Sequence, residues 1–283
     1  MKKIQKLIGV ILLASVVMTT SFGTSIANAK TNTNNLKNVK AFNTKEEYVN
    51  FFNKHNVPKD KQQGLLEKLD KDILWDAYNP EKIKEVPESF NTFSIDDPVD
   101  NIRYYRFEDG SFIAIETRAS EETKRLRQTE KPSIKNNLQA AVSDGMKTES
   151  VVSDSFGSQY TDHMVSKWVG AANAGFRSSF YIARWGTSSF NGISWDQYAS
   201  GLGCSGAPEI QYVREKEEVA SPYNRAALRR IFWQANATVN VAWETKGISL
   251  GASIPVGTTM SLYLALVNNS YYVNSALPSN IYN

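Results

Sequence analysis

The hydrophobic pattern of residues 42–75 predicts two short amphipathic helices. The first has aromatic residues at the i, i+3, i+4 spacing of one helix face, preceded by residues that can cap it. The second, from 59 to 71, comes after Val57-Pro58 and places leucines on one side. Short helices cannot bury their apolar stripes alone, so we expect them to pack on each other and on the next segments of the chain. These signals come from Asn43, Thr44, Tyr48, Phe51, Phe52, Leu65, Leu66 and Leu69.

Residues 102–117 have the pattern of a β-hairpin. Alternating side chains precede Glu108-Asp109-Gly110-Ser111, and a β-rich run from Phe112 to Thr117 comes next. The Asp-Gly pair predicts the turn, because glycine adopts the positive φ of a tight hairpin turn without steric cost.

The last part of the chain changes to the period of two that strands require. Alternating residues share a face in 176–182, 239–243 and 260–266, with turn residues between these segments. One short helix is expected from Pro222 to Phe232, where Ser221 can serve as its cap. The predicted fold class is α+β, with a small N-terminal helical and hairpin region followed by a C-terminal all-β domain, a sandwich or small barrel.

The N-terminus has the three parts of a secretory signal peptide. A basic start at Met1-Lys2-Lys3 precedes an apolar run from Leu7 to Met18, and small residues stand at Ala27 and Ala29. The apolar run is shorter than the ~20 residues that a membrane-spanning helix needs. We therefore predict secretion, with cleavage between Ala29 and Lys30.

The segment 118–150 lacks aromatic residues and is rich in charge. It could hold an exposed helix around 121–127, but no apolar stripe is visible, which favours a linker. Its basic cluster Lys124–Arg127 would be open to trypsin-like cleavage. The expected divisions are a signal peptide 1–29, a flexible leader 30–40, a helix pair plus hairpin 41–117, a polar linker 118–150 and a β-rich domain 151–283.

Charge argues against a nucleic-acid partner. The chain has 32 Lys and Arg against 29 Asp and Glu, but residues 1–29 hold three lysines and no acid. The mature chain therefore has no formal net charge, whereas nucleic-acid binding needs a surplus of basic residues.

The stretch Gly201-Leu202-Gly203-Cys204-Ser205-Gly206 fits the pattern G-x-G-x-x-G of dinucleotide sites. Its context is wrong, because no strand-to-helix transition and no acid about 20 residues downstream accompany it, and Pro208 opposes a helix. We expect a bend between strands and no nucleotide cofactor. Cys204 is the only cysteine; a Cys204–His163 pair oriented by Asp162 is one reading, and an inert thiol is the favoured one.

Other catalytic signatures are missing from the sequence. The only histidines are His55 and His163, and no nucleophile elbow is present. No metal-ligand spacing occurs, so neither a metal nor any other cofactor is expected. A pair of carboxylates in a hydrolase stays open, because their separation in space is invisible in a sequence.

Two features are candidates for surface contact; for the tryptophans, packing in the core is the favoured alternative. Trp185 beside Gly186 and Trp195 in "GISWDQY" are the tryptophans with the most surface-like context. Residues 247–283 contain no charged or histidine side chain; they predict either central strands around a turn at 254–257 or a hairpin able to enter a bilayer. The candidate membrane or surface contacts are Trp185, Trp195, Leu250, Ile254, Leu262, Tyr263 and Leu264.

The order of these features resembles a group of secreted proteins of Gram-positive bacteria. The resemblance rests on "LWDAYNPEKI", "VPESF" and "YYRFEDGSF", then the polar linker and an end that closes on "YYVNSALP". The architecture is also similar to geobacillin-type large, heat-labile bacteriocins. That similarity implies an action on the membrane energetics of target cells and assigns no functional residues.

These observations support three hypotheses. The leading one is a secreted antibacterial protein that acts, without a catalytic site, on the target cell's membrane or an envelope component. The second is a non-toxic secreted protein that binds the cell envelope or carbohydrate. The third is a hydrolase of unknown class.

Overall fold

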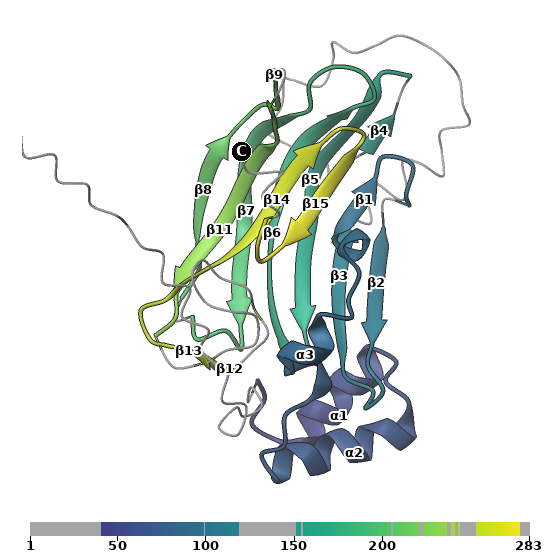
Figure 1. Cartoon of the computed structure of the whole chain (residues 1–283), viewed down its shortest axis with the longest axis vertical. Coiled ribbons are helices and arrows are strands. Elements are labelled where there is room, and N and C mark those ends of the chain that lie inside the picture. The colour runs from purple at the N-terminus through teal and green to yellow at the C-terminus, as the bar shows by residue number, and fades with distance from the viewer. Residues whose placement is uncertain are drawn as a thin grey trace, which may run out of the picture. The chain divides into compact units, whose positions relative to one another are not determined.

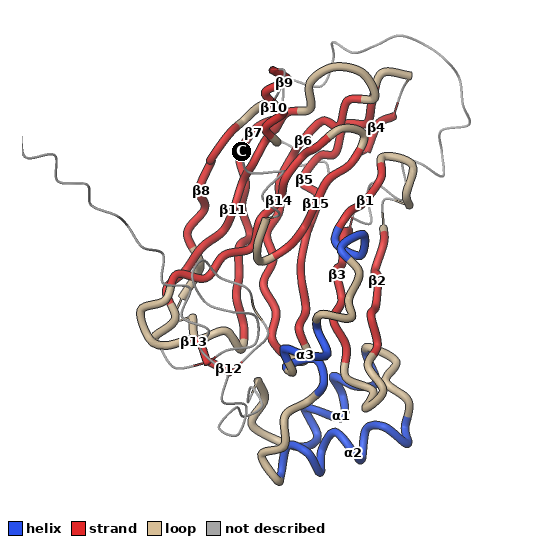
Figure 2. Tube along the Cα trace, in the orientation of Figure 1, coloured by secondary structure: helices blue, strands red, loops and turns tan. Residues whose placement is uncertain are grey.

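Two antiparallel sheets face each other, and helices cover one end of them (Figures 1 and 2). The computed structural model describes residues 41–98, 100–118, 151–153, 155–204, 206–220, 223–236, 239–240, 243 and 253–277. All of them fall within the unit Thr33–Asn283. The predicted signal peptide and leader, nearly all of the predicted linker, and Leu250 lie outside the described residues.

The two predicted helices are confirmed. Helix α1 spans Lys45–Lys54, and Thr44 forms a capping box with Glu47 at its start. Helix α2 spans Lys59–Asp70. The short helix α3 (Pro80–Ile83) and the 3₁₀ turns Asp76–Tyr78 and Glu88–Asn91 come after them.

The larger sheet has six strands and includes the predicted hairpin. Its strand order is β2-β3-β5-β6-β7, with β4 paired to β5. The bounds are β2 Asn101–Arg106, β3 Phe112–Arg118, β4 Val151–Ser153, β5 Gly157–Val169, β6 Ala172–Ala183 and β7 Ser189–Ser200. Gly110 has φ +90° in the β2–β3 turn, as the Asp-Gly signal predicts. Because β3 is hydrogen-bonded to β5, the hairpin and the β-rich region share one sheet.

The second sheet has five strands in the order β1-β15-β14-β11-β8. Its strands are β1 Thr92–Ser94, β15 Ser270–Asn274, β14 Thr259–Val267, β11 Ala227–Gln234 and β8 Glu209–Arg214. Strand β14 packs over β6 and β15 over β5, which gives the α+β fold with a sandwich-like arrangement of sheets. Two small ribbons complete the fold, β9 Glu218–Ala220 with β10 Tyr223–Arg225 and β12 Val239–Asn240 with β13 Ser253–Ile254.

The helix predicted from Pro222 to Phe232 is wrong. This segment forms β10 and most of β11, and β11 is paired on one side with β14 and on the other with β8. The prediction rested on Ser221 and Pro222, which lie outside the described residues. Local capping signals are weak, and two strand partners override them by pairing the backbone of the whole segment.

The core lies between the sheets and accounts for the uncharged C-terminal stretch. Strand β14 is central in its sheet, and one face places Met260, Leu262, Leu264 and Leu266 in the main core. Its other face joins a small second cluster of buried residues, Ala226, Leu228, Ala265 and Tyr272. The central-strand reading therefore holds for β14 and β15, whose positions inside the sheet leave little room for charge. The expected turn is misplaced: residues 254–257 lie at the end of β13 of the small ribbon and just after it, and the turn between the two central strands is at 268–269.

One arginine crosses the core and is hydrogen-bonded to the opposite sheet. Arg229 of β11 is 1% exposed, and its guanidinium lies between the rings of Phe190 and Tyr212, 4.5 and 4.6 Å from their centroids. All five of its donors are used. The acceptors are Glu215 Oε1 (3.2 Å) and Oε2 (2.5 Å), Ser178 Oγ (3.2 Å), Ser194 Oγ (3.0 Å) and Gly192 O (2.8 Å). The two serines and Gly192 belong to β6 and β7, so this side chain joins the sheets.

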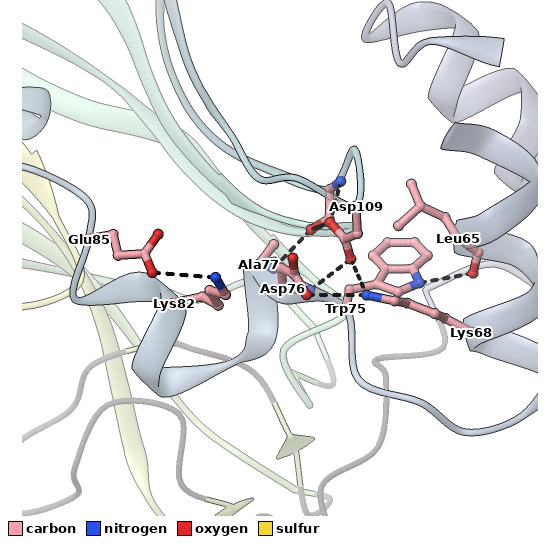
Figure 3. A network of polar contacts seen from close by, with 9 residues as sticks. Leu65, Lys68, Trp75, Asp76, Ala77, Lys82, Glu85 and Asp109 are labelled. Carbon is pink, nitrogen blue, oxygen red and sulfur yellow. Dashed lines mark hydrogen bonds and ion pairs between the residues drawn. The ribbon is translucent and has the colours of Figure 1, made fainter. Parts of the chain in front are cut away.

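A polar network attaches the helices to the hairpin turn (Figure 3). Lys68 Nζ of α2 donates to Asp109 Oδ2 at 2.8 Å and to Asp76 Oδ1 at 3.2 Å. The backbone N–H of Asp76 also donates to Asp109, at 2.9 Å. Burial opposes ionisation of Asp109, but the hydrogen bonds from Lys68 and Ser111 outweigh it and lower the pKa of this carboxyl.

Substituting Asp109→Ala is expected to lower the free energy of unfolding by about 2–3 kcal/mol, because Lys68 and the Asp76 N–H lose a largely buried acceptor. Urea unfolding measures the change. Asp70→Ala is the control: it removes the exposed ion pair with Lys45 and should cost about 0.5 kcal/mol or less. Equal losses in the two variants would contradict the proposed attachment.

Candidate functional site

Two β-bulges build a polar cluster on the face of the larger sheet that points away from the core. In β6, Phe176 and Ser178 are buried toward the core, so Arg177 between them lies on the outer face. The pairing of β5 with β6 is interrupted at Asp162, and that of β7 with β6 at Asp196. Both aspartates have a left-handed backbone, with φ of 48° and 55°. Aspartate tolerates this conformation better than most residues, which suits it to a bulge.

Arg177 joins the two bulges. Its Nη1 donates to the backbone oxygen of Asp162 at 3.0 Å, and its Nε donates to Asp196 Oδ2 at 3.2 Å. The guanidinium lies 5.3 Å from the centroid of the Trp195 ring. The indole N–H of Trp195 donates to Asp162 Oδ1 at 3.0 Å, and Ser179 Oγ accepts from the Asp162 N–H at 2.9 Å. We call Asp162, Arg177, Ser179, Trp195 and Asp196 the outer-face patch.

The outer-face patch combines a held aromatic ring with groups that face solvent. Trp195 is half-buried, whereas the Asp196 side chain is 55% exposed and that of Arg177 is 22% exposed. A second ring, Tyr198, lies over Gly175 on the same face: a Cβ on that glycine would be 2.8 Å from the tyrosine Oη. Such a surface can stack on a flat apolar face of a ligand and hydrogen-bond its hydroxyl groups.

Trp185 belongs to a different exposed region, the turn between β6 and β7. This turn lies at the end of the sheets opposite the helices, where Figure 1 labels β4 and β9. Trp185 is 80% exposed, Phe156 is 67% exposed before β5, and Val219 of β9 is 60% exposed. The Arg184 N–H donates to the Phe156 oxygen at 2.7 Å, and the Glu217 N–H donates to the Ser188 oxygen at 2.9 Å. The β6–β7 turn is therefore a neighbour of the segment before β5 and of the segment that leads into β9. We call Phe156, Trp185 and Val219 the apolar tip.

The predicted contacts in the uncharged end do not form a surface. Ile254, Leu262 and Leu264 have no exposed area and lie in the main core. Tyr263 is half-buried, and its hydroxyl accepts from Arg230 Nη1 at 3.1 Å. Burial therefore corrects the expectation for all three residues. The opposite sheet covers the face of β14 that carries Leu262 and Leu264, and Ile254 of the small ribbon is buried in the same core cluster.

The glycine-rich stretch is the connection between β7 and β8, as expected. Gly201, Gly203 and Gly206 have positive φ, and the next element is a strand. The Cys204 Sγ donates to the Gly206 oxygen at 3.1 Å, and burial raises the pKa of this thiol, which favours the unreactive form. His163 lies among the rings of Tyr160, Phe180 and Tyr271.

Within the described residues, no group of His, Cys, Asp or Glu side chains is arranged to hold a metal ion. Over the same part of the chain, no helix combines the length and the apolar character that crossing a membrane requires. Ala29 and Lys30, the predicted cleavage site, lie outside it.

Sequence reasoning found Trp195 but missed most of its neighbours. In the sequence, Asp162 is a candidate only as the orienting residue of a Cys204–His163 pair, and no pattern marks Arg177 or Asp196. Aspartates at 162 and 196 become neighbours of Arg177 only through the pairing of three strands and two one-residue bulges. No bulge signal such as an interior glycine marks Asp162 or Asp196 in the sequence.

Comparison with known proteins gives no relative: no family model, no curated protein and no solved structure matches the chain.

His55, the second histidine considered for chemistry, is part of the helix–sheet contact. It is 2% exposed at the end of α1, and its ring lies 4.7–5.0 Å from those of Phe51, Trp168 and Phe112. Nδ1 is 3.0 Å from the Tyr104 hydroxyl, and within the described residues Nε2 has no hydrogen-bond partner. Burial, together with the charges of Lys54 and Arg106, lowers its pKa to about 4.

This burial predicts a loss of stability in mild acid. Above the unfolded-state pKa of about 6.5, His55 is neutral in both states; below it, the unfolded chain binds a proton that the folded chain does not bind until about pH 4. The free energy of unfolding should therefore fall by about 2 kcal/mol from pH 7 to pH 5 on this account. Urea unfolding at both pH values measures it. His55→Gln should remove this part of the pH dependence, and an unchanged dependence in the variant would refute the assignment.

Proposed function

We propose that this protein binds a polysaccharide of the bacterial cell envelope through the outer-face patch. The observation that carries the proposal is the Trp195 ring held on an open sheet face between Arg177 and the two bulge aspartates. Sugar rings present apolar C–H faces and peripheral hydroxyl groups, which suit a stacking ring bordered by carboxylates and a guanidinium.

The rigidity of the outer-face patch supports binding. Trp195 is fixed by its bond to Asp162, and Arg177 is fixed by both bulges, so little conformational entropy remains to be lost when a ligand binds. Bulges of this kind commonly redirect side chains at functional sites.

The charge of the outer-face patch favours a neutral ligand. Asp162 and Asp196 contribute two carboxylates against the single guanidinium of Arg177, which disfavours a densely anionic polymer. A neutral envelope polysaccharide, or the glycan strands of peptidoglycan, is the class of ligand that fits.

Trp195→Ala is expected to weaken binding of the mature chain to purified peptidoglycan or neutral envelope polysaccharide at least about tenfold, since stacking is lost and Asp162 loses its donor. Co-sedimentation with the insoluble polymer measures the change. Trp185→Ala is the matched control, because its ring lies in the apolar tip and should leave binding unaltered. If Trp195→Ala binds the polymer as well as Trp185→Ala does, the outer-face patch is not the binding site.

The apolar tip favours a second candidate, the membrane-active antibacterial protein expected from the sequence. Its three residues are exposed apolar side chains on neighbouring segments, and exposed apolar side chains at one end of a protein can enter the boundary of a bilayer. In this hypothesis the apolar tip contacts the membrane. The uncharged C-terminal strands do not, because their apolar side chains are buried.

For this candidate, Trp185→Ala should reduce binding of the mature chain to phosphatidylcholine vesicles about tenfold, because the most exposed ring no longer leaves water. Vesicle flotation measures it, with Trp195→Ala as the matched control. If the wild-type chain neither binds vesicles nor depolarises sensitive bacteria, the membrane hypothesis is refuted while the polysaccharide proposal stands.

A further inference from the structure

A buried lysine of one sheet contacts a buried asparagine of the other. Lys167 of β5 is 7% exposed and Asn274, the last residue of β15, is 7% exposed. Lys167 Nζ donates to Asn274 Oδ1, and these residues are 107 positions apart in the chain. The lysine belongs to the six-stranded sheet and the asparagine to the five-stranded sheet.

The surroundings of this pair are aromatic and polar at once. Lys167 Nζ lies 5.8 Å from the centroid of the Trp243 ring, which is itself buried. Asn274 Oδ1 also accepts from the Ser275 N–H at 2.8 Å and from the Ser275 Oγ at 3.3 Å. Asn274 Nδ2 donates to the Tyr272 hydroxyl at 2.9 Å.

We propose that Lys167 and Asn274 form an intramolecular isopeptide bond. The Lys167 Nζ attacks Asn274 Cγ, a new Nζ–Cγ amide bond forms, and the Cγ–Nδ2 bond breaks. One proton passes from Nζ to the departing nitrogen, which leaves as ammonia. The step is an exchange of one amide for another, so no oxidant, reductant or further reactant is consumed.

Each group around the pair has a place in this reaction. The neutral form of the amine carries the electron pair that attacks the carbon. The two donors of Ser275 point at Oδ1, where negative charge develops as Nζ adds to the carbonyl carbon. The Tyr272 hydroxyl accepts a hydrogen bond from Nδ2 and so lies beside the nitrogen that departs. Nζ is in hydrogen-bond contact with Oδ1, the oxygen bonded to the carbon that it attacks, so the two reacting groups are held together.

The bond would connect the two sheets covalently in a protein whose only cysteine cannot form an intrachain disulfide. It would close a loop of 107 residues, and cross-links of this span restrict the unfolded chain strongly. The inference is independent of the proposed function, since neither the outer-face patch nor the apolar tip includes these residues.

Intact mass spectrometry of the purified mature chain tests the proposal. The expected result is a mass lower than that of the sequence by one ammonia, and a branched tryptic peptide that joins the segments of Lys167 and Asn274 and is not cleaved at Lys167. Under denaturing electrophoresis the cross-linked chain should also migrate faster than the uncrosslinked variant.

Lys167→Arg should restore the full mass and remove the branched peptide, and Asn173→Ala, a change at a buried asparagine of β6, should leave both signals in place. A succinimide at Asn274-Ser275 also loses ammonia, but it would persist in Lys167→Arg and would join no peptides. Full mass in the folded wild-type chain, or a loss of ammonia without the branched peptide, would overturn the proposal; the wild-type measurement decides even if a variant fails to fold.

Discussion

Mutual burial of the two sheets is the constraint on which the other features depend. Each sheet has an apolar face that only the other sheet can cover, and the main core lies between them. A polar group that enters this space must find its partners across the gap, because an unpaired buried charge is costly. Arg229 meets that requirement with Glu215 on one side and with two serines and a carbonyl of the opposite sheet on the other. The same interaction that satisfies the guanidinium also sets the relative position of β11, β6 and β7.

The helices complete the fold at one end and leave part of the outer face of the larger sheet to other uses. Helix α1 packs through Phe51 and His55 against Phe112 and Trp168 at that end. Further along the same face, the side chains are polar and aromatic, and the two bulges gather them around Arg177. Strands β5, β6 and β7 therefore form a rigid platform for a surface site. The packed interior between the two sheets stabilises the fold.

The uncharged C-terminal end shows how topology changes the meaning of a pattern. In isolation, alternating apolar residues without charge fit both a membrane hairpin and a central strand. Strand β14 has a neighbour on each side, one face buried in the main core and Ala265 buried on the other face, so its lack of charge reflects its position in the sheet. The exposed apolar side chains lie elsewhere, at the tip around Trp185, in loops where the sequence shows no long pattern.

The sequence by itself determined the local elements. Helices α1 and α2, the Asp109-Gly110 turn, the inward face of β6 and the bend at Gly201–Gly206 all depend on neighbouring residues, whose spacing is readable in one dimension. Only the tertiary structure decided that residues 223–234 are strands, that Leu262 and Leu264 are interior, and that Asp162, Arg177 and Asp196 surround Trp195. The same holds for Lys167 and Asn274, 107 residues apart. The physical reason is that strand pairing and sheet packing join distant segments, and a shift of one residue in register would move each of these side chains to the opposite face.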